Sequence, residues 1–305
     1  MRILSIQSSV AYGHVGNSAA TFPLQRLGHQ VWPVITVHFS NHTGYGAWRG
    51  PVLDPADVRE VIAGISDRGV LGTADAVLSG YQGSPGVAEV VLDTVAQIRQ
   101  LNPRVIYCCD PVMGDAGRGF FVLPGIPALM RDRVVPAADI VTPNAFELGY
   151  LAGDGSDPDT ATPADVSTVD AVLAAVARVR ESGPRTVLVT SVELGAAAPG
   201  AGRQAGDAAD TDPGQIGMIA VDDSGAYRVR TPVLPISVNG LGDVTAALFL
   251  AHLADGAQVA LGRVASSVFA ILQATLDAGS QEIALVSAQD RIAHPAGEFA
   301  VTRIG

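Results

Sequence analysis

Lysine is absent from this sequence, in which all 19 basic residues among 305 are arginine. The absence excludes a Gly-Lys-Ser/Thr phosphate loop and the strand lysine of protein kinases. It also excludes an enzyme that holds pyridoxal phosphate as a cofactor, because that cofactor forms a Schiff base with a lysine amine. Any anionic substrate must therefore be bound by backbone dipoles, arginine or a metal ion.

Cysteine and positive charge are also scarce. The two cysteines, Cys108 and Cys109, are adjacent and poorly placed for an ordinary disulfide, so we predict that they are small buried residues of a strand. Thirty acidic residues against 19 basic ones give a net charge of −11. This balance argues against nucleic acid or an anionic membrane as the main partner.

Long hydrophobic runs are few. Residues 1–8 become polar too soon for a signal peptide, and His252, Asp255 and Arg263 interrupt the apolar C-terminal runs before they reach spanning length. We therefore expect a cytoplasmic protein without a membrane span. With 48% hydrophobic residues, no internal repeat and no evident boundary, residues 1–305 are predicted to form a single domain.

Strand and helix patterns alternate along the chain, which predicts an α/β fold with a central, mostly parallel, doubly wound sheet and helices on both faces. The expected parallel strands are residues 2–7, 30–37, 76–79, 104–109, 138–141 and 185–189, and the expected helices between them are 17–27, 55–67, 85–101 and 166–182. Residues 215–221 and 226–231 are predicted to pair antiparallel, before two helices that end near residue 279. Residues 195–214, rich in Ala and Gly, are expected to form a long disordered loop.

Polar residues follow several of these strands, beginning with Ser8 after the first. Asp110 and Asp115 lie in a segment that follows one strand, and Glu147 lies in the segment that follows the next. The carboxyl ends of parallel strands meet at one edge of the sheet, so the three acids could hold Mg²⁺, directly or through water, beside nucleotide phosphates. Taken singly, each acid is more typical of a helix cap or a solvated charge.

The stretch that best indicates a reaction is residues 239–250. Gly240 and Gly242 precede Asp243, and an apolar helical run follows. Glycines before a helix N-terminus leave backbone amides free to bind an anion. A carboxylate beside them could accept a proton from an attacking hydroxyl, which indicates phosphoryl transfer. The alternative is a simple helix cap, which aspartate also favours.

Residues 39–50, called the flap below, are dense in aromatic, hydroxyl and glycine residues without a period. Such a loop suits a cover over a small ring-bearing ligand, although exposed Tyr and Trp also mark protein interfaces. His42 within the flap could contact a ligand, act in catalysis or make a hydrogen bond within the loop.

Taken together, six segments resemble the pyridoxal kinase family of the ribokinase-like superfamily: residues 5–20, 39–45, 78–81, 109–114, 142–147 and 240–243. The match covers most of the chain up to about residue 150, then Thr190, Ser191 and the Gly-Leu-Gly-Asp helix start. The Gly-x-Gly-Asp element is shared by many small-molecule kinases, whereas the N-terminal segments are specific to the pyridoxal branch. The resemblance implies a three-layer ribokinase-like fold.

The resemblance also implies an activity, the transfer of the γ-phosphoryl group of ATP to the 5′-hydroxymethyl oxygen of pyridoxal. Asp243 would be the base, and the backbone of Gly240, Leu241, Gly242 and Asp243 would form an anion hole. Ser8 and Thr43 would hydrogen-bond the pyridine substituents, and Tyr81 would pack beside the ring. The residues implied at the nucleotide are Asp110, Thr142, Asn144, Glu147, Thr190, Ser191 and Gly240, and those implied at the metal are Asp110, Asp115 and Glu147. Mg²⁺, a monovalent cation such as K⁺, and a homodimer are further implications.

Two other functions stay open. One is hydroxymethylpyrimidine kinase, although relatives with that activity carry a reactive cysteine in a lid, which Cys108 and Cys109 do not match. The other is a non-catalytic binder of B6 vitamers, against which Asp110, Glu147 and Asp243 speak together. The sequence departs from the family at Asn239 and Leu241, where an apolar residue and a small or hydroxyl residue are common.

Overall fold

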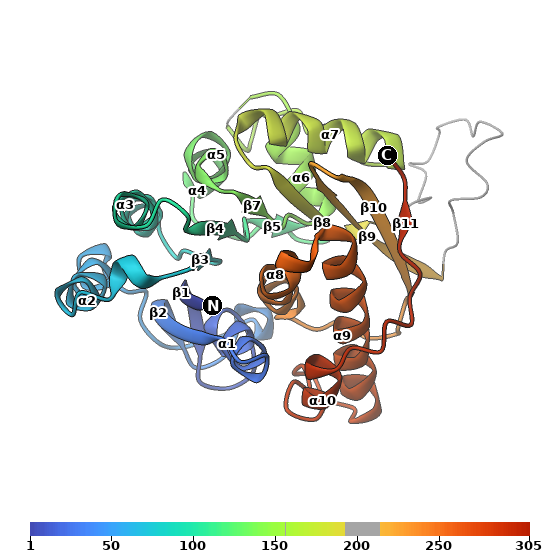
Figure 1. Ribbon diagram of the computed structural model, residues 1–305, viewed down its shortest axis with the longest axis horizontal. Helices are drawn as coiled ribbons and strands as arrows, with labels where there is room; N and C mark the ends of the chain where they lie inside the picture. Colours follow the sequence, from blue (N-terminus) through green and yellow to red (C-terminus); the bar gives the residue numbers. More distant parts are fainter. Residues whose placement is uncertain (156, 193–213) are drawn as a thin grey trace.

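A computed structural model describes residues 1–155, 157–192 and 214–305 (Figure 1). The loop expected at 195–214 lies outside the described residues except for Gly214. A nine-stranded sheet forms the centre, in the order β11-β10-β9-β8-β7-β4-β3-β1-β2. The strands of this sheet are β1 (Arg2–Val10), β2 (Gln30–Phe39), β3 (Ala76–Ser79), β4 (Ile106–Cys109), β7 (Ile140–Val141), β8 (Thr186–Val192), β9 (Gln215–Asp222), β10 (Gly225–Pro232) and β11 (Thr302–Arg303). Pairing is parallel from β2 to β8, and β9, β10 and β11 add antiparallel neighbours.

Helices cover both faces of the sheet, so the predicted three-layer α/β fold is confirmed (Figure 1). One face packs against α2 (Pro55–Asp67), α3 (Pro85–Leu101), α6 (Ala145–Ala152) and α7 (Val169–Ser182). The other packs against α1 (Asn17–Arg26), α8 (Leu241–His252), α9 (Ala257–Asp277) and α10 (Gln289–Ala293). Short elements complete the described chain: α4 (Ile126–Leu129), α5 (Val135–Ala137), the π-helical turn Met130–Val134, the 3₁₀ turns Thr43–Tyr45, Leu71–Thr73 and Leu253–Asp255, and a hairpin of β5 (Gly114–Asp115) and β6 (Gly119–Phe120).

Successive side chains of a strand point to opposite faces of the sheet, so each central strand contributes to both hydrophobic layers. In β4, Tyr107 and Cys109 face the α2/α3 layer, whereas Cys108 faces the α1/α8 layer, and all three are fully buried. This is the period of two expected of a strand that is covered on both sides. Both cysteines are free, as predicted. Burial raises the pKa of the Cys108 thiol well above its ordinary value.

Two strands extend further than the sequence pattern predicts. β1 continues through Ser8 to Val10, and β8 continues through Thr190 and Ser191 to Val192. Each extension contains a break in register, between Gln7 and Ser9 in β1 and between Val189 and Val192 in β8. Such bulges re-aim side chains at the edge of a binding site. The predicted site residues Ser8, Thr190 and Ser191 therefore lie within irregular strand ends rather than in loops.

The long helix α9 corrects one prediction. Arg263 was expected to interrupt the apolar run, but it lies inside this 21-residue helix, which is long and apolar enough to cross a membrane by length and composition alone. Its buried side chains pack against the sheet and α8, within the core layer. An apolar helix of this kind is typical of a protein core, and we interpret α9 as a core helix.

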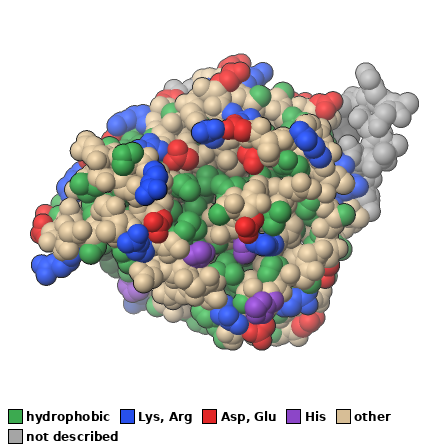
Figure 2. All heavy atoms as spheres, viewed as in Figure 1, with side chains coloured by type: hydrophobic (Ala, Val, Ile, Leu, Met, Phe, Trp, Pro, Cys, Tyr) green, Lys and Arg blue, Asp and Glu red, His purple; other side chains and the backbone are tan. Residues whose placement is uncertain are grey.

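Charged side chains of both signs are interspersed over the face shown in Figure 2. Several form ion pairs at the surface, such as Arg99 with Asp139 at 2.9 Å and Arg26 with Asp290 at 3.0 Å. Because exposed pairs of this kind contribute little to stability, the fold rests mainly on its two hydrophobic layers.

Candidate active site

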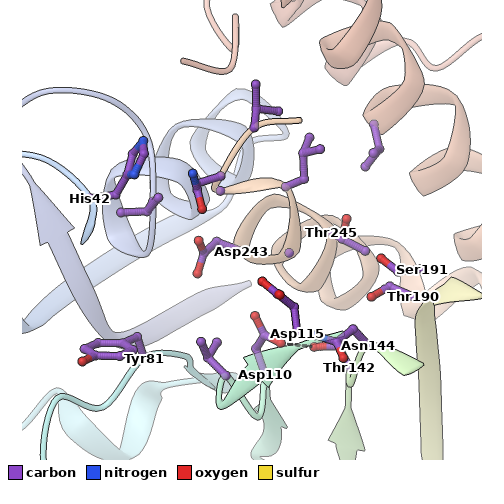
Figure 3. Close-up of a pocket in the computed structure, with 18 of the residues that line it drawn as sticks. His42, Tyr81, Asp110, Asp115, Thr142, Asn144, Thr190, Ser191, Asp243 and Thr245 are labelled. Atoms are coloured by element: carbon purple, nitrogen blue, oxygen red, sulfur yellow. Dashed lines mark hydrogen bonds between the residues drawn. The ribbon is translucent and has the colours of Figure 1, made fainter. Parts of the chain in front are cut away.

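A cavity of 430 Å³ lies at the carboxyl ends of the parallel strands. Its size is that of small-molecule sites. The residues labelled in Figure 3 arrange it in three parts. His42 and Tyr81 lie at one end, Asp243 and Asp110 in the middle, and Thr190 and Ser191 at the other end. The segments that were predicted separately from the sequence thus converge on one pocket.

Asp243 projects into the middle of this pocket from the first turn of α8 (Figure 3). The N-cap position is occupied by Gly240, which has no side chain, and Asp243 lies two residues inside the helix. Burial raises the pKa of Asp243 to about 6, although hydrogen bonds from the backbone amides of Gly16 and of Asp243 itself act in the opposite direction. The alternative of a simple helix cap is therefore not what the structure shows at Asp243.

Gly240 has a left-handed backbone with φ of 91°. A Cβ atom at this position would lie 1.9 Å from the carbonyl oxygen of His14, so no other residue fits without displacing the loop before α1. The next glycine, Gly242, faces the acids: a Cβ atom there would lie 3.9 Å from Asp110 Oδ2. The helix N-terminus, with its free amides, therefore points at the centre of the pocket.

Asp110 and Glu147 lie together below the start of α8, and both are almost fully buried. Burial raises the pKa of Asp110 well above its ordinary value, and the negative charges of Glu147 and Asp243 raise it further, against the hydrogen bond that Thr142 donates at 3.0 Å. No basic side chain contributes to this balance among the described residues. The middle of the pocket consequently has an excess of negative charge.

Asp115, the third predicted metal ligand, lines the pocket but is paired with Arg118. Its carboxylate accepts hydrogen bonds from the Arg118 side chain at 2.9 Å and from the backbone amides of Gly117 and Arg118. Burial acts to raise the pKa of Asp115, but the interactions with Arg118 outweigh it and lower the pKa. Among the described residues, no three acidic, histidine or cysteine side chains converge as a metal cluster. Arg118 is the one arginine among the described residues that line the pocket.

Asn144 and Glu147 form a capping box at the start of α6. Asn144 Oδ1 accepts from the Glu147 amide at 2.9 Å, and Glu147 Oε2 accepts from the Asn144 amide at 3.0 Å. Glu147 Oε1 accepts from the Met113 amide at 2.8 Å. Burial raises the pKa of Glu147 to about 7, and these amides oppose that rise. The structural alternative considered for Glu147, a helix cap, is thus confirmed.

Replacing Asn144 by alanine should therefore lower stability. The variant loses the cap, and it also loses the hydrogen bond from Asn144 Nδ2 to the Gly114 carbonyl at 2.8 Å. We expect the free energy of unfolding to fall by about 1 to 2 kcal/mol, measured by denaturant unfolding. Asn144→Ser keeps a capping oxygen without adding a charge beside Glu147 and should lose less stability than the alanine variant. An alanine variant as stable as the wild type would contradict this assignment.

Ser8, Thr43 and Tyr81, the predicted substrate residues, all line the flap end of the pocket. Val10, Val37 and Phe39 form a small hydrophobic cluster there, against which Tyr81 packs. Ser8 is buried, and its hydroxyl lies next to Gly16. This end therefore offers an apolar wall and a few hydroxyl groups, which suits a flat ring with polar substituents.

Thr190, Ser191 and Asn144 lie toward the opposite end (Figure 3), and side chains of α9 such as Phe269 also line the pocket. Ser191 has φ of 55°, the one positive value among the described non-glycine residues. Asn239, whose role was open, lies at the flap instead, because a Cβ atom on Gly44 would be 2.9 Å from its Nδ2.

Three contributors were missed by sequence reasoning. Gly16 was noted only as part of a motif, yet its amide reaches Asp243. Arg118 lay in a segment without any prediction. Glu282 lies after the last predicted helix, in a segment without any prediction, but it contacts the flap across 237 residues of sequence. Local patterns carry no signal for contacts at such separations.

Comparisons with known proteins agree with this geometry. The chain matches the family described as phosphomethylpyrimidine kinase over residues 72–279. It is 55% identical to a pyridoxal kinase PdxY of Leifsonia xyli subsp. xyli, over 100% of both chains. It is 56% identical to a pyridoxal kinase PdxY of Rubrobacter xylanophilus, over 100% of this chain and 98% of that one.

A solved structure of a pyridoxal kinase has the same fold. The pyridoxal kinase of Leishmania donovani in complex with ADP and pyridoxine superposes with a TM-score of 0.85 and 29% identity, covering 100% of this chain and 99% of that one. Full-length identities above one half, together with the same fold and a pocket that contains the family's motifs, leave a single assignment. The chain belongs to the pyridoxal kinase family.

Proposed function

We propose that this protein is a pyridoxal kinase, which transfers the γ-phosphoryl group of ATP to the 5′-hydroxymethyl oxygen of pyridoxal and serves B6 vitamer salvage. The observation that carries the proposal is the position of Asp243. Its carboxylate lies beside a helix N-terminus, between a ring-sized apolar end and a hydroxyl-lined end of one pocket. That is where an acceptor hydroxyl and a terminal phosphate would meet.

The chemistry follows from this position. Asp243 would accept the proton of the 5′-hydroxyl group as its oxygen attacks the γ-phosphorus, and ADP would leave on the opposite side. The amides at residues 240–243 would stabilise the charge that develops on the transferred group. Ser8 and Thr43 would orient the vitamer ring beside Tyr81, while Thr142, Asn144, Thr190 and Ser191 would contact the nucleotide.

A divalent cation fits the residues present. Asp110 and Glu147 are buried with excess negative charge, and carboxylate oxygens are preferred Mg²⁺ ligands. Since Glu147 already accepts three backbone amides, we propose that Asp110 holds Mg²⁺ directly and that Glu147 and Asp115 act through water. Mg²⁺ would supply charge neutralisation at the phosphates. A monovalent cation, K⁺, is proposed beside it from the family resemblance.

Further proposals concern the whole protein. We propose one domain over residues 1–305, a homodimer and a cytoplasmic location. The nine-stranded sheet supports the first, because both large hydrophobic layers of the described residues pack on it. The homodimer follows from the family resemblance alone. The free, buried cysteines accord with a reducing compartment.

Hydroxymethylpyrimidine kinase is the second candidate, because the matching family description, phosphomethylpyrimidine kinase, names a kinase of a closely related pyrimidine. Relatives with that activity carry a reactive cysteine in a lid. Here both cysteines are buried in β4, and neither lies at the pocket. The pyridoxal assignment is therefore favoured.

The direct test is ATP- and Mg²⁺-dependent conversion of pyridoxal to its 5′-phosphate, followed by absorbance, with hydroxymethylpyrimidine in parallel. We expect turnover of pyridoxal. Turnover of the pyrimidine alone would move the chain to the sister reaction, and binding of pyridoxal without turnover of either compound would make it a vitamer binder.

The pKa of Asp243 predicts a pH dependence. A base must be deprotonated to act, and burial raises the pKa of Asp243 to about 6. The value of kcat/KM for pyridoxal should thus be constant above that pH and fall about tenfold per pH unit below it. The residual activity of Asp243→Asn should lack this acidic limb. A limb that persists in the variant would assign it to another group, such as Glu147.

A further inference from the structure

The carboxylate of Glu282 joins three segments that are far apart in the sequence. Its Oε2 accepts a hydrogen bond from the His14 amide at 3.1 Å, in the loop before α1. Its Oε1 accepts one from the Tyr45 hydroxyl at 2.8 Å and lies 3.1 Å from His42 Nε2, both in the flap. The Glu282 side chain is only 11% exposed, and its partner His42 is similarly buried, whereas Tyr45 is 40% exposed.

Glu282 itself is held in place by its own turn. The Ser280 hydroxyl donates to the Glu282 carbonyl at 2.7 Å, and the Glu282 amide donates back to Ser280 Oγ at 3.0 Å. Two residues later, the Ala284 amide donates to Thr275 Oγ1 in α9 at 2.9 Å. The carboxylate is therefore presented from a fixed turn at the end of the core helix.

The flap lies close against the pocket and the segment before α8. The rings of His42 and Tyr45 are stacked with centroids 4.5 Å apart. A Cβ atom on Gly44 would lie 2.9 Å from both His42 Nδ1 and Asn239 Nδ2, so the flap approaches the segment before α8 closely. His42 is 9% exposed and lines the pocket next to Thr43. The contacts of Glu282 with Tyr45 and His42 hold this arrangement in place.

The other contact of Glu282 leads toward the reacting groups. His14, whose amide it binds, has its carbonyl oxygen against Gly240. Gly16, two residues further, contributes an amide to Asp243. One carboxylate thus supports both the cover of the ring end and the loop behind the anion hole.

We propose that Glu282 is a positioning residue that fastens the flap over bound pyridoxal and aligns it with the loop that contacts the anion hole. The inference rests on the proposed kinase activity. Glu282 acts through Tyr45, His42 and His14 and does not itself contact the reacting atoms. Hydrogen bonds to an ionised carboxylate are stronger than neutral ones, so this residue type is suited to the task.

The test compares steady-state kinetics of Glu282→Gln, Glu282→Ala and Tyr45→Phe with the wild type. Tyr45→Phe removes one hydroxyl from the flap and should raise KM for pyridoxal about threefold to tenfold, with kcat and KM for ATP unchanged. Glu282→Ala should raise it about tenfold to a hundredfold. Glu282→Gln keeps the shape of the side chain but replaces one acceptor by a donor. Its KM for pyridoxal should lie between those of Tyr45→Phe and Glu282→Ala.

A double variant distinguishes a specific contact from general damage. Once Glu282 is alanine, adding Tyr45→Phe should have little further effect on KM, because the hydroxyl has already lost its acceptor. Glu298→Gln, a like substitution in the exposed ion pair with Arg291, is the control and should leave all constants unchanged.

Separate outcomes overturn the inference and the function. If wild-type protein phosphorylates pyridoxal but the Glu282 and Tyr45 variants keep its KM, the positioning role is wrong while the activity stands. Equal losses for pyridoxal and ATP would likewise refute it, since they would indicate global damage. A wild type that does not turn over pyridoxal would refute the function, and unaltered pyridoxal binding by Glu282→Gln, measured by calorimetry, would then refute the positioning role independently.

Discussion

Replacing Asp243 by asparagine should lower kcat for pyridoxal phosphorylation by about a thousandfold, within the range expected when a general base is removed. The amide has the same shape and leaves α8 intact, but it cannot accept the proton of the 5′-hydroxyl group. Because Gly240 rather than Asp243 is the N-cap of α8, and because the asparagine side-chain oxygen can still accept a backbone amide, the substitution should not unfold the helix. KM for ATP should stay close to the wild-type value.

Asp54→Asn provides the matched control. Asp54 also lies at a helix N-terminus, where its side chain accepts a hydrogen bond from the Ala56 amide at 2.8 Å, but it is exposed on α2 and outside the pocket. Asparagine is an equally good cap, so this variant should keep wild-type kcat. Full activity in Asp243→Asn would disprove the assigned base.

Gly240→Ala should lower kcat by about a hundredfold or more, as expected when a backbone donor is moved out of an anion hole. A Cβ atom at this position would lie 1.9 Å from the His14 carbonyl oxygen, which is too close for any relaxed structure. Either the loop before α1 or the first turn of α8 must shift. A shift of α8 displaces the amides of residues 240–243 from the transferred phosphoryl group, and a shift of the loop moves the Gly16 amide away from Asp243.

A second glycine separates this clash from simple backbone strain. Gly256 is the N-cap of α9 and has the same φ of 91°, but a Cβ atom there would meet nothing within 4 Å. The ψ of Gly256 is 153°, a backbone region almost confined to glycine, so Gly256→Ala incurs backbone strain of about 1 to 3 kcal/mol without the contact. It should lower thermal stability while keeping kcat. Equal activity in the two alanine variants would contradict a role for the Gly240 backbone in the reaction.

Much of the scaffold could be predicted from periodicity. The bounds of α2, α3 and β3 match the sequence prediction, because each lies between clear start and stop signals such as Asp54-Pro55 and Ser84-Pro85. The ends of β1 and β8 could not be predicted in the same way. Their bulges depend on pairing with β2 and β9, and a local pattern does not contain the partner strand.

The site, too, contains residues that could be predicted from the sequence and residues that could not. Asp243, Asp110 and Thr43 follow from motifs, since glycine, acid and hydroxyl residues at strand ends have a direct chemical meaning. Glu282 has no motif of its own, and its role depends on where the turn after α9 meets a flap that begins at residue 39. The helices α4, α5 and α6 were also missed, because with 4, 3 and 8 residues they are too short to show a clear helical period.

The two-residue strand β11 has a consequence for solubility. It pairs with Tyr227 and Arg228 and so covers part of the outer edge of β10, which would otherwise present unpaired amides and carbonyls beside hydrophobic side chains such as Val229. Exposed edges of this kind recruit strands from other molecules and promote aggregation. Pairing of Thr302 and Arg303 with β10 therefore protects part of this edge from pairing with other molecules. A tag or fusion placed after Gly305 should include a flexible linker so that β11 can still pair.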